Sequence, residues 1–147
     1  GPQALIDAMV VVQSQNSSGA SAISQAAAVA AYEGGLEFLP PQRAAYQARR
    51  DAIMTQLSQV QGVEVLNPEG AFFIFCRCAG MLGKTRPDGR LLESEQDVLN
   101  YLLESGVSGV AGSAYGLSPY FRLSIATDIE TVREAGRRIA AACAALK

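Results

Sequence analysis

The sequence predicts an α+β fold, in which helices pack on a small sheet of about four short strands and two further helices precede this layer. From Pro40 onward, the patterns follow the order helix, strand, strand, helix, strand, strand, helix. Residues 1–39 hold two helical patterns and no strand, so we expect them to belong to another structural unit. The chain has 147 residues, 49% of them hydrophobic, which is enough for a buried core.

The N-terminal helices are predicted by apolar spacing and by alanine content. Apolar residues recur at helical spacing within residues 1–12, and the polar residues 13–19 are expected to form a loop. The alanine-rich stretch 20–33 favours a second helix, with Ser17 or Ser18 as its N-cap.

The next three elements are a helix and a hairpin. Residues 40–62 carry a helical apolar stripe after two prolines, which the first turn of a helix tolerates. Residues 63–66 and 71–77 are expected to form strands, joined by an Asn-Pro-Glu-Gly turn. Phe72 and Phe73 are adjacent, so we expect their side chains to point to opposite faces, one of them away from the main core.

The remaining elements are a helix over 94–106, a strand over 107–110, a glycine-rich loop over 111–119, a strand and a final helix. Thr127-x-x-Glu130 matches the capping-box pattern and is expected to start the final helix.

The last strand carries an arginine in its middle. Side chains alternate along a strand, so Arg122 shares a face with Ser124, whereas Phe121 and Leu123 face the core. Spacing alone favours an arginine that covers a solvated face. The alternative is a guanidinium that binds a carboxylate or phosphate through two parallel hydrogen bonds, with small neighbours leaving room for the ligand.

Composition argues against several functions. The chain has no histidine, which removes histidine bases, catalytic triads and the commonest metal ligand, and we expect no metal site. Its three cysteines complete neither a zinc site nor a disulfide framework, so we expect packing residues in a reducing, cytoplasmic setting. The net charge of −2 includes no basic block, and no apolar run could span a bilayer, so we expect no nucleic-acid and no membrane partner.

Four stretches of the chain stand in the order found in a known family. They are "QSQNSSG" with the helix after it, "NPEGAFFIF", "GKTRPDGR" and "YFRLS". Together they resemble the class I aminotransferases of fold type I that use pyridoxal 5'-phosphate, in the aspartate-aminotransferase-like branch. The resemblance implies that residues 1–39 are the helical tail of the large, cofactor-binding domain and that residues 40–147 are the C-terminal small domain.

The same resemblance implies transfer of an amino group between an amino acid, aspartate or similar, and a 2-oxo acid, by a homodimer. In the family, the arginine that matches Arg122 binds the α-carboxylate of the substrate. Phe72 matches an aromatic residue near the substrate, and Asn16 falls in the 13–19 loop, which lies near the active site at the dimer interface. These three are the expected substrate-binding residues, and no catalytic residue is expected.

The family's lysine, which forms a Schiff base with the cofactor, has no credible counterpart here. Lys84 stands in a loop rich in proline and glycine, and Lys147 is the last residue. The chain therefore resembles the C-terminal piece of an aminotransferase whose N-terminal part is missing, and we expect the piece alone to be inactive. The alternative is a non-enzymatic regulatory or interaction domain of the same fold, in which Arg122 is a surface residue.

Overall fold

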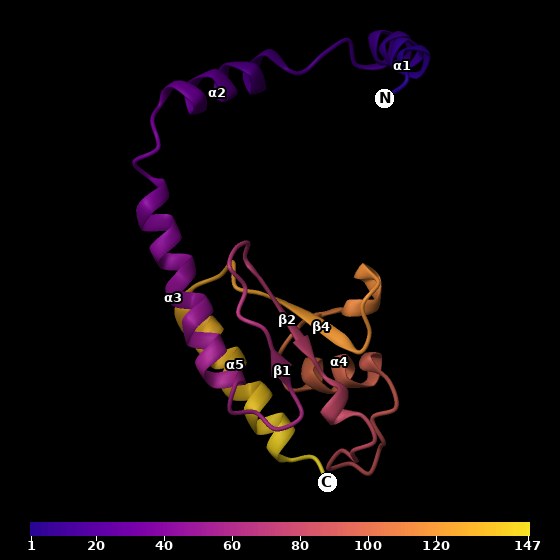
Figure 1. The fold of residues 1–147 in the computed structure, drawn as a ribbon, viewed down its shortest axis with the longest axis vertical. Helices are drawn as coiled ribbons and strands as arrows, with labels where there is room; N and C mark the ends of the chain where they lie inside the picture. The colour runs from indigo at the N-terminus through magenta and orange to yellow at the C-terminus, as the bar shows by residue number, and fades with distance from the viewer. The chain divides into compact units, whose positions relative to one another are not determined.

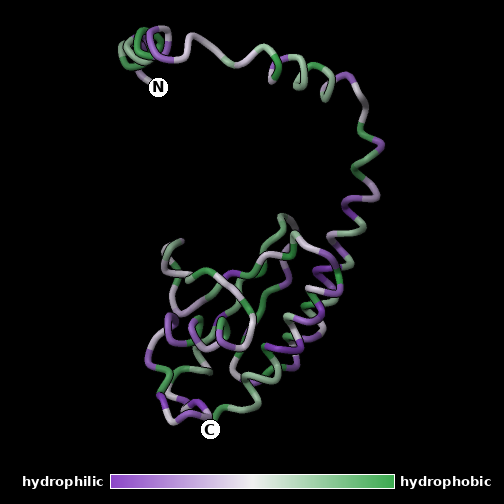
Figure 2. Tube along the Cα trace, turned by 180° about the vertical axis from the view of Figure 1, so that it is seen from behind, coloured by the Kyte–Doolittle hydropathy of each residue, from purple (hydrophilic) through white to green (hydrophobic).

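The computed structural model describes residues 1–147, which divide into two units, Gly1–Leu39 and Pro40–Lys147. The first unit contains α1 (Gln3–Asn16) and α2 (Ala22–Glu33) (Figure 1). Neither helix has a buried residue. Hydrophobic residues recur along both helices, as the green segments in Figure 2 show. These helices therefore form without a core of their own.

Two expectations for this unit are wrong. The stretch expected to begin a loop at Gln13 continues α1 as far as Asn16. Its polar residues suit a helix: glutamine is a good helix former, and the Ser14 hydroxyl donates to the Val11 carbonyl at 2.7 Å. The N-cap of α2 is Ser21, not Ser17 or Ser18, and its side chain makes no capping hydrogen bond.

The second unit confirms the predicted α+β order. Its elements are α3 (Leu39–Leu57), β1 (Glu64–Val65), β2 (Phe73–Arg77), α4 (Glu95–Glu104), β3 (Val110–Ala111), β4 (Tyr120–Ser124) and α5 (Ile129–Ala144). The four strands form one antiparallel sheet in the order β1-β2-β4-β3. The two longest strands, β2 and β4, are therefore neighbours at its centre, although α4 and β3 separate them in the sequence.

The core lies on one face of this sheet. Ile74 and Cys76 of β2 and Phe121 and Leu123 of β4 are buried, together with apolar residues of α3, α4 and α5. Helices α3 and α5 run side by side (Figure 1), and Gln56 Nε2 donates to the Arg133 carbonyl between them at 3.1 Å. The alternate residues of the two central strands form the opposite face, called here the open face: Phe73, Phe75, Arg77, Tyr120, Arg122 and Ser124.

Helix caps explain where α4 and α5 begin. Ser94 caps α4 in a capping box with Asp97. Helix α5 is capped by Asp128, whose Oδ1 accepts the N–H of Thr131 at 2.8 Å, so the expected Thr127–Glu130 box is wrong. An aspartate at the N-cap both accepts an unpaired helix N–H and places negative charge at the positive end of the helix dipole.

All three cysteines are free and buried. Burial raises the pKa of the Cys78 and Cys143 thiols to about 11. Both thiols are therefore protonated near neutral pH and pack as small apolar groups, as expected from the sequence. None of the helices combines the length and hydrophobicity that crossing a membrane requires.

Candidate substrate-binding site

The guanidinium of Arg122 lies between two aromatic rings on the open face. Its central carbon is 4.0 Å from the ring centroid of Phe73 and 4.6 Å from that of Tyr115. Phe73 precedes Phe75, the cross-strand partner of Arg122, by two residues, so β2 places its ring diagonally opposite the arginine. Tyr115 comes from the 3₁₀-helix Gly112–Tyr115, which follows β3. Stacking restricts the planar guanidinium to one plane and leaves its N–H edge free.

Arg122 also differs from most other arginines of the chain in having no acidic partner. Seven of the ten arginines form ion pairs; the exceptions are Arg43, Arg49 and Arg122. Arg43 is exposed on α3, and Arg49 stacks on Tyr46 at 5.0 Å. Of these three arginines only Arg122 lies on the sheet, where it is half-buried and no protein group satisfies its donors. A half-buried cation in this setting favours an anionic ligand.

Phe72 and Phe73 are both outside the core, which corrects the prediction that they point to opposite faces. Phe72 lies one residue before β2 and is 42% exposed, so strand alternation does not govern it. Its ring packs on the ring of Phe73 at 4.3 Å between centroids, and the ring of Tyr46 lies 6.4 Å away. Phe72 is therefore connected to Arg122 through Phe73.

Asn16 does not lie in a loop, as the sequence suggested, but is the last residue of α1. It is exposed and belongs to the first unit, whereas Phe72 and Arg122 belong to the second. The structure thus brings together two of the three predicted site residues within one unit.

Tyr115 and Phe73 are contacts of the site that the sequence did not reveal. Tyr115 stands in a stretch that looks like a flexible glycine-rich connection, "AGSAYG". Its ring also meets that of Phe75 edge-on, at 5.7 Å and 80°. Only the pairing of β4 with β2 on one side and with β3 on the other shows that these aromatic residues lie around one arginine. The sequence did contain a signal for this site, because aromatic and basic residues occupy alternate positions on both strands and therefore share one face of the sheet.

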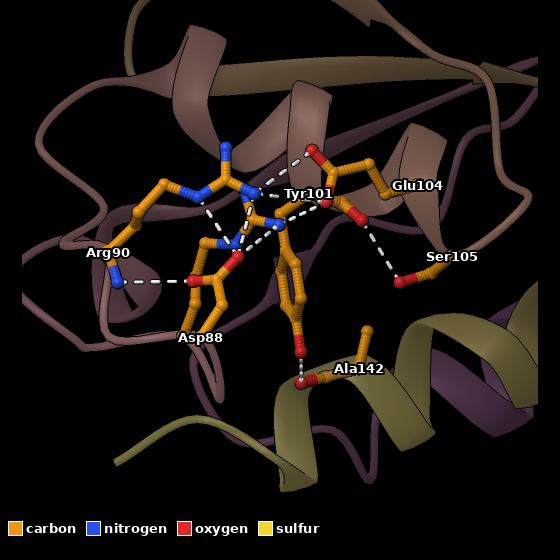
Figure 3. Close-up of polar contacts among 7 residues, drawn as sticks. Asp88, Arg90, Tyr101, Glu104, Ser105 and Ala142 are labelled. Atoms are coloured by element: carbon orange, nitrogen blue, oxygen red, sulfur yellow. Dashed lines mark hydrogen bonds and ion pairs between the residues drawn. The ribbon is translucent and has the colours of Figure 1, made fainter.

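A second cluster of charged groups has a structural role. The buried Arg86 guanidinium pairs with Glu104 and with Asp88, the latter at 3.1 Å, and stacks on Tyr101 at 4.9 Å. The Tyr101 hydroxyl donates to the Ala142 carbonyl at 2.9 Å (Figure 3). Arg90 completes the network through Asp88 at 2.7 Å. Since its carboxylates compensate the arginines, this cluster fastens the 82–92 loop to α4 and offers no comparable site for an anion.

The lysines do not belong to the Arg122 site. The Lys84 carbonyl accepts the backbone N–H of Leu92, and the charge of Lys84 lies close enough to Cys143 to lower the pKa of its thiol. Lys147 pairs with Thr85 through two backbone hydrogen bonds. The neighbours of Arg122 are aromatic residues. No group of His, Cys, Asp and Glu residues is arranged to hold a metal ion.

The fold and the site together define a two-layer α+β domain with a stacked, unpaired arginine on the open face of its sheet. The family described as aminotransferase class I and II matches residues 1–139. The chain therefore belongs to this aminotransferase family.

Individual aminotransferases resemble the chain in sequence and in structure. The chain is 49% identical over 144 residues to an aspartate aminotransferase of Rhizobium meliloti, covering 97% of this chain and 35% of the relative. It is 45% identical to an aspartate/prephenate aminotransferase of Cereibacter sphaeroides, covering 99% of this chain and 37% of the relative. A crystal structure of the aspartate aminotransferase from Rhizobium meliloti superposes with a TM-score of 0.92 at 48% identity, over 100% of this chain and 37% of that one.

The chain thus spans little more than a third of the length of the relatives it matches.

Proposed function

We propose that this chain is the C-terminal part of an aminotransferase, with residues 1–39 ending the large domain and residues 40–147 forming the small domain. The enzyme transfers an amino group between an amino acid and a 2-oxo acid. The names of the two relatives support aspartate as the amino donor. The second name also supports prephenate as a 2-oxo acid that accepts the amino group. The family match and the share of each relative that is covered support this assignment.

The observation that carries the proposal is the unpaired guanidinium of Arg122. Every amino acid and every 2-oxo acid has a carboxylate next to the reacting carbon, so one fixed arginine serves both substrates. A planar guanidinium donates two parallel hydrogen bonds to such a carboxylate, which fixes the orientation of the substrate as well as its position. The rings of Phe73 and Tyr115 hold the guanidinium in one plane.

The cofactor of the proposed reaction is pyridoxal 5'-phosphate, which acts as an electron sink when it is bound. The residues near Arg122 fit the substrate carboxylate but not this cofactor, because no lysine lies among them. We therefore propose that the lysine that holds the cofactor belongs to a part of the enzyme outside residues 1–147. Accordingly, residues 1–147 alone are proposed to be inactive.

We further propose that Phe72 lines the substrate site and that Asn16 contributes to it near the interface of a homodimer. Phe72 is supported by its ring contact with Phe73, which in turn covers Arg122. Asn16 is supported by its exposure at the end of α1 and by the family resemblance.

The test replaces Arg122 by alanine and by lysine in the full-length enzyme. Loss of a paired, charge-assisted hydrogen bond is expected to cost about 2–5 kcal/mol in kcat/KM. Lysine restores the charge but not the two-pronged geometry, so Arg122→Lys is expected to recover only part of the activity. Steady-state kinetics with L-aspartate and with L-alanine provide the measurement, because the α-carboxylate is common to both.

Arg77→Ala is the matched control, since Arg77 lies on the same open face but pairs with Glu64 at 2.7 Å. Its kinetics are expected to equal those of the unmodified enzyme. If Arg122→Ala left both KM and kcat unchanged, the proposed carboxylate site would be wrong, and Arg122 would be a surface residue that does not contact the substrate.

A further inference from the structure

Glu95 is a buried carboxylate that holds two distant points of the chain. It is the first residue of α4 and is only 8% exposed. Its Oε1 accepts the backbone N–H of Ser113 at 3.0 Å, and its Oε2 accepts that of Tyr120 at 3.2 Å. Ser113 lies in the 3₁₀-helix after β3, and Tyr120 begins β4. One side chain therefore joins both ends of the segment 113–120.

This segment carries the aromatic ring that covers Arg122. It closes on itself, because the Leu117 N–H donates to the Gly112 carbonyl at 3.0 Å. Gly112 has no room for a side chain, since an added Cβ would overlap the Leu117 carbonyl and Tyr120. Tyr115 is thus held by a tight turn whose ends are anchored on Glu95, and its ring lies 4.6 Å from the Arg122 guanidinium.

Capping of α4 does not account for Glu95. Ser94 and Asp97 already form a complete capping box at this helix start. Glu95 has no ion-pair partner, and a buried carboxylate without hydrogen bonds is strongly disfavoured. Burial alone would raise its pKa, but hydrogen bonds from Ser113, Ser118 and Tyr120 outweigh burial and hold the pKa below the ordinary value. The carboxylate is therefore ionised near neutral pH.

We propose that Glu95 is a positioning residue for the substrate carboxylate, acting through the 113–120 segment and Tyr115 on the guanidinium of Arg122. This inference rests on the proposed function of Arg122. Without the two hydrogen bonds, the N–H groups of Ser113 and Tyr120 lose their partner and the segment relaxes. The Tyr115 ring then no longer restricts the Arg122 guanidinium. The substrate must order this side chain when it binds, and the entropy lost in doing so weakens substrate binding.

The test is Glu95→Gln in the full-length enzyme, assayed with L-aspartate as donor and 2-oxoglutarate as acceptor. Glutamine keeps the size of the side chain but offers only one acceptor oxygen. We expect the KM for both substrates to rise on the order of tenfold while the enzyme remains folded. We expect kcat to change by no more than about twofold, since the reacting groups are untouched.

Asp97→Asn is the matched control, because it removes the capping carboxylate of the same helix turn without touching the 113–120 segment. It is expected to lower thermal stability and to leave KM unchanged. If Glu95→Gln does not fold, Tyr115→Leu replaces it as the test, because Tyr115 is 48% exposed and its loss leaves the core intact. Tyr115→Leu removes the ring that lies against Arg122 and is expected to raise KM similarly.

The double variant Glu95→Gln with Tyr115→Leu tests whether Glu95 affects KM through Tyr115. If Glu95 acts through Tyr115, the double variant raises KM no further than the larger single effect. The inference would be wrong if the fold-increase in KM of the double variant equalled the product of the two single fold-increases. It would also be wrong if Glu95→Gln left KM unchanged while Arg122→Ala raised it. An unchanged KM in Arg122→Ala would instead refute the proposed function itself.

Discussion

At the scale of single residues, Arg122 shows how a side chain on a sheet face can be ordered without an ion pair. Strand alternation places it on the open face, and the rings of Phe73 and Tyr115 cover its two sides. Aromatic stacking leaves the N–H groups of a guanidinium available, whereas a carboxylate partner occupies them. Arg86, which pairs with Asp88 and Glu104, shows the second outcome in the same chain.

Glu95 predicts a pH dependence of stability. Its pKa in the folded chain is lower than the ordinary value of 4.5. A carboxyl with a lowered folded pKa stabilises the fold above its ordinary pKa, and this contribution is lost as pH falls through the folded pKa. We expect the difference in unfolding free energy between the unmodified chain and Glu95→Gln to be largest near neutral pH and to shrink below about pH 4.

Urea unfolding followed by circular dichroism, from pH 7 down to pH 3, measures this difference. Hydrogen bonds also lower the pKa values of Asp97 and Asp128, but both proteins contain these residues, so their contribution cancels. A difference that stayed constant with pH would show that the Glu95 carboxylate does not contribute through its charge.

At the scale of elements, the N-termini of α4 and α5 show how neighbouring residues compete for the N-cap position. Ser94 has one acidic residue at the right spacing, and the capping box forms as the pattern indicates. At α5 two residues compete, and Asp128 becomes the N-cap although Thr127 has the matching glutamate. The helix begins one residue later than the motif suggests, which places Thr131 at the capped position.

This difference gives a prediction for the final helix. Asp128→Ala is expected to destabilise the chain by about 1 kcal/mol, because it removes both the N-cap acceptor and a favourable charge. Thr127→Ala is expected to have little effect, since its hydroxyl makes only a 3.4 Å contact with Asp128. Denaturant unfolding of the two variants provides the comparison. A larger loss for Thr127→Ala would show that the capping box forms in solution after all.

At the scale of the whole molecule, the two units differ in how they are stabilised. Every residue of the hydrophobic core lies between Ile53 and Cys143. Helices α1 and α2 bury nothing within the chain, and large apolar residues such as Met9, Val12 and Ile23 remain exposed. Exposed apolar surface on this scale is typical of segments that associate with other protein surfaces.

Removal of residues 1–38 is therefore expected to leave the thermal unfolding midpoint within about 2 °C of that of the whole chain, because the core is untouched. The whole chain is expected to associate as its concentration rises, and the shortened chain to associate less. Calorimetry and sedimentation measure the two effects. A large drop in the midpoint would show that the first unit stabilises the second.

Sequence and structure contributed differently to the candidate site. The face of Arg122 follows from strand alternation alone, and the element order follows from apolar spacing. The resemblance to aminotransferases supplied a role for the arginine that spacing left open. The placement of Phe72 was predicted incorrectly because it precedes the strand, so alternation does not apply to its side chain.

The sequence by itself determined the α+β order, the buried faces of the central strands and the residue on which the proposed function depends. Only the tertiary structure decided what surrounds that residue. Phe73 and Tyr115 contact Arg122, and Glu95 holds the segment that carries Tyr115; these contacts join residues up to 49 positions apart in the sequence. Local patterns are set by neighbours along the chain, whereas these contacts depend on which distant segments the common core brings together.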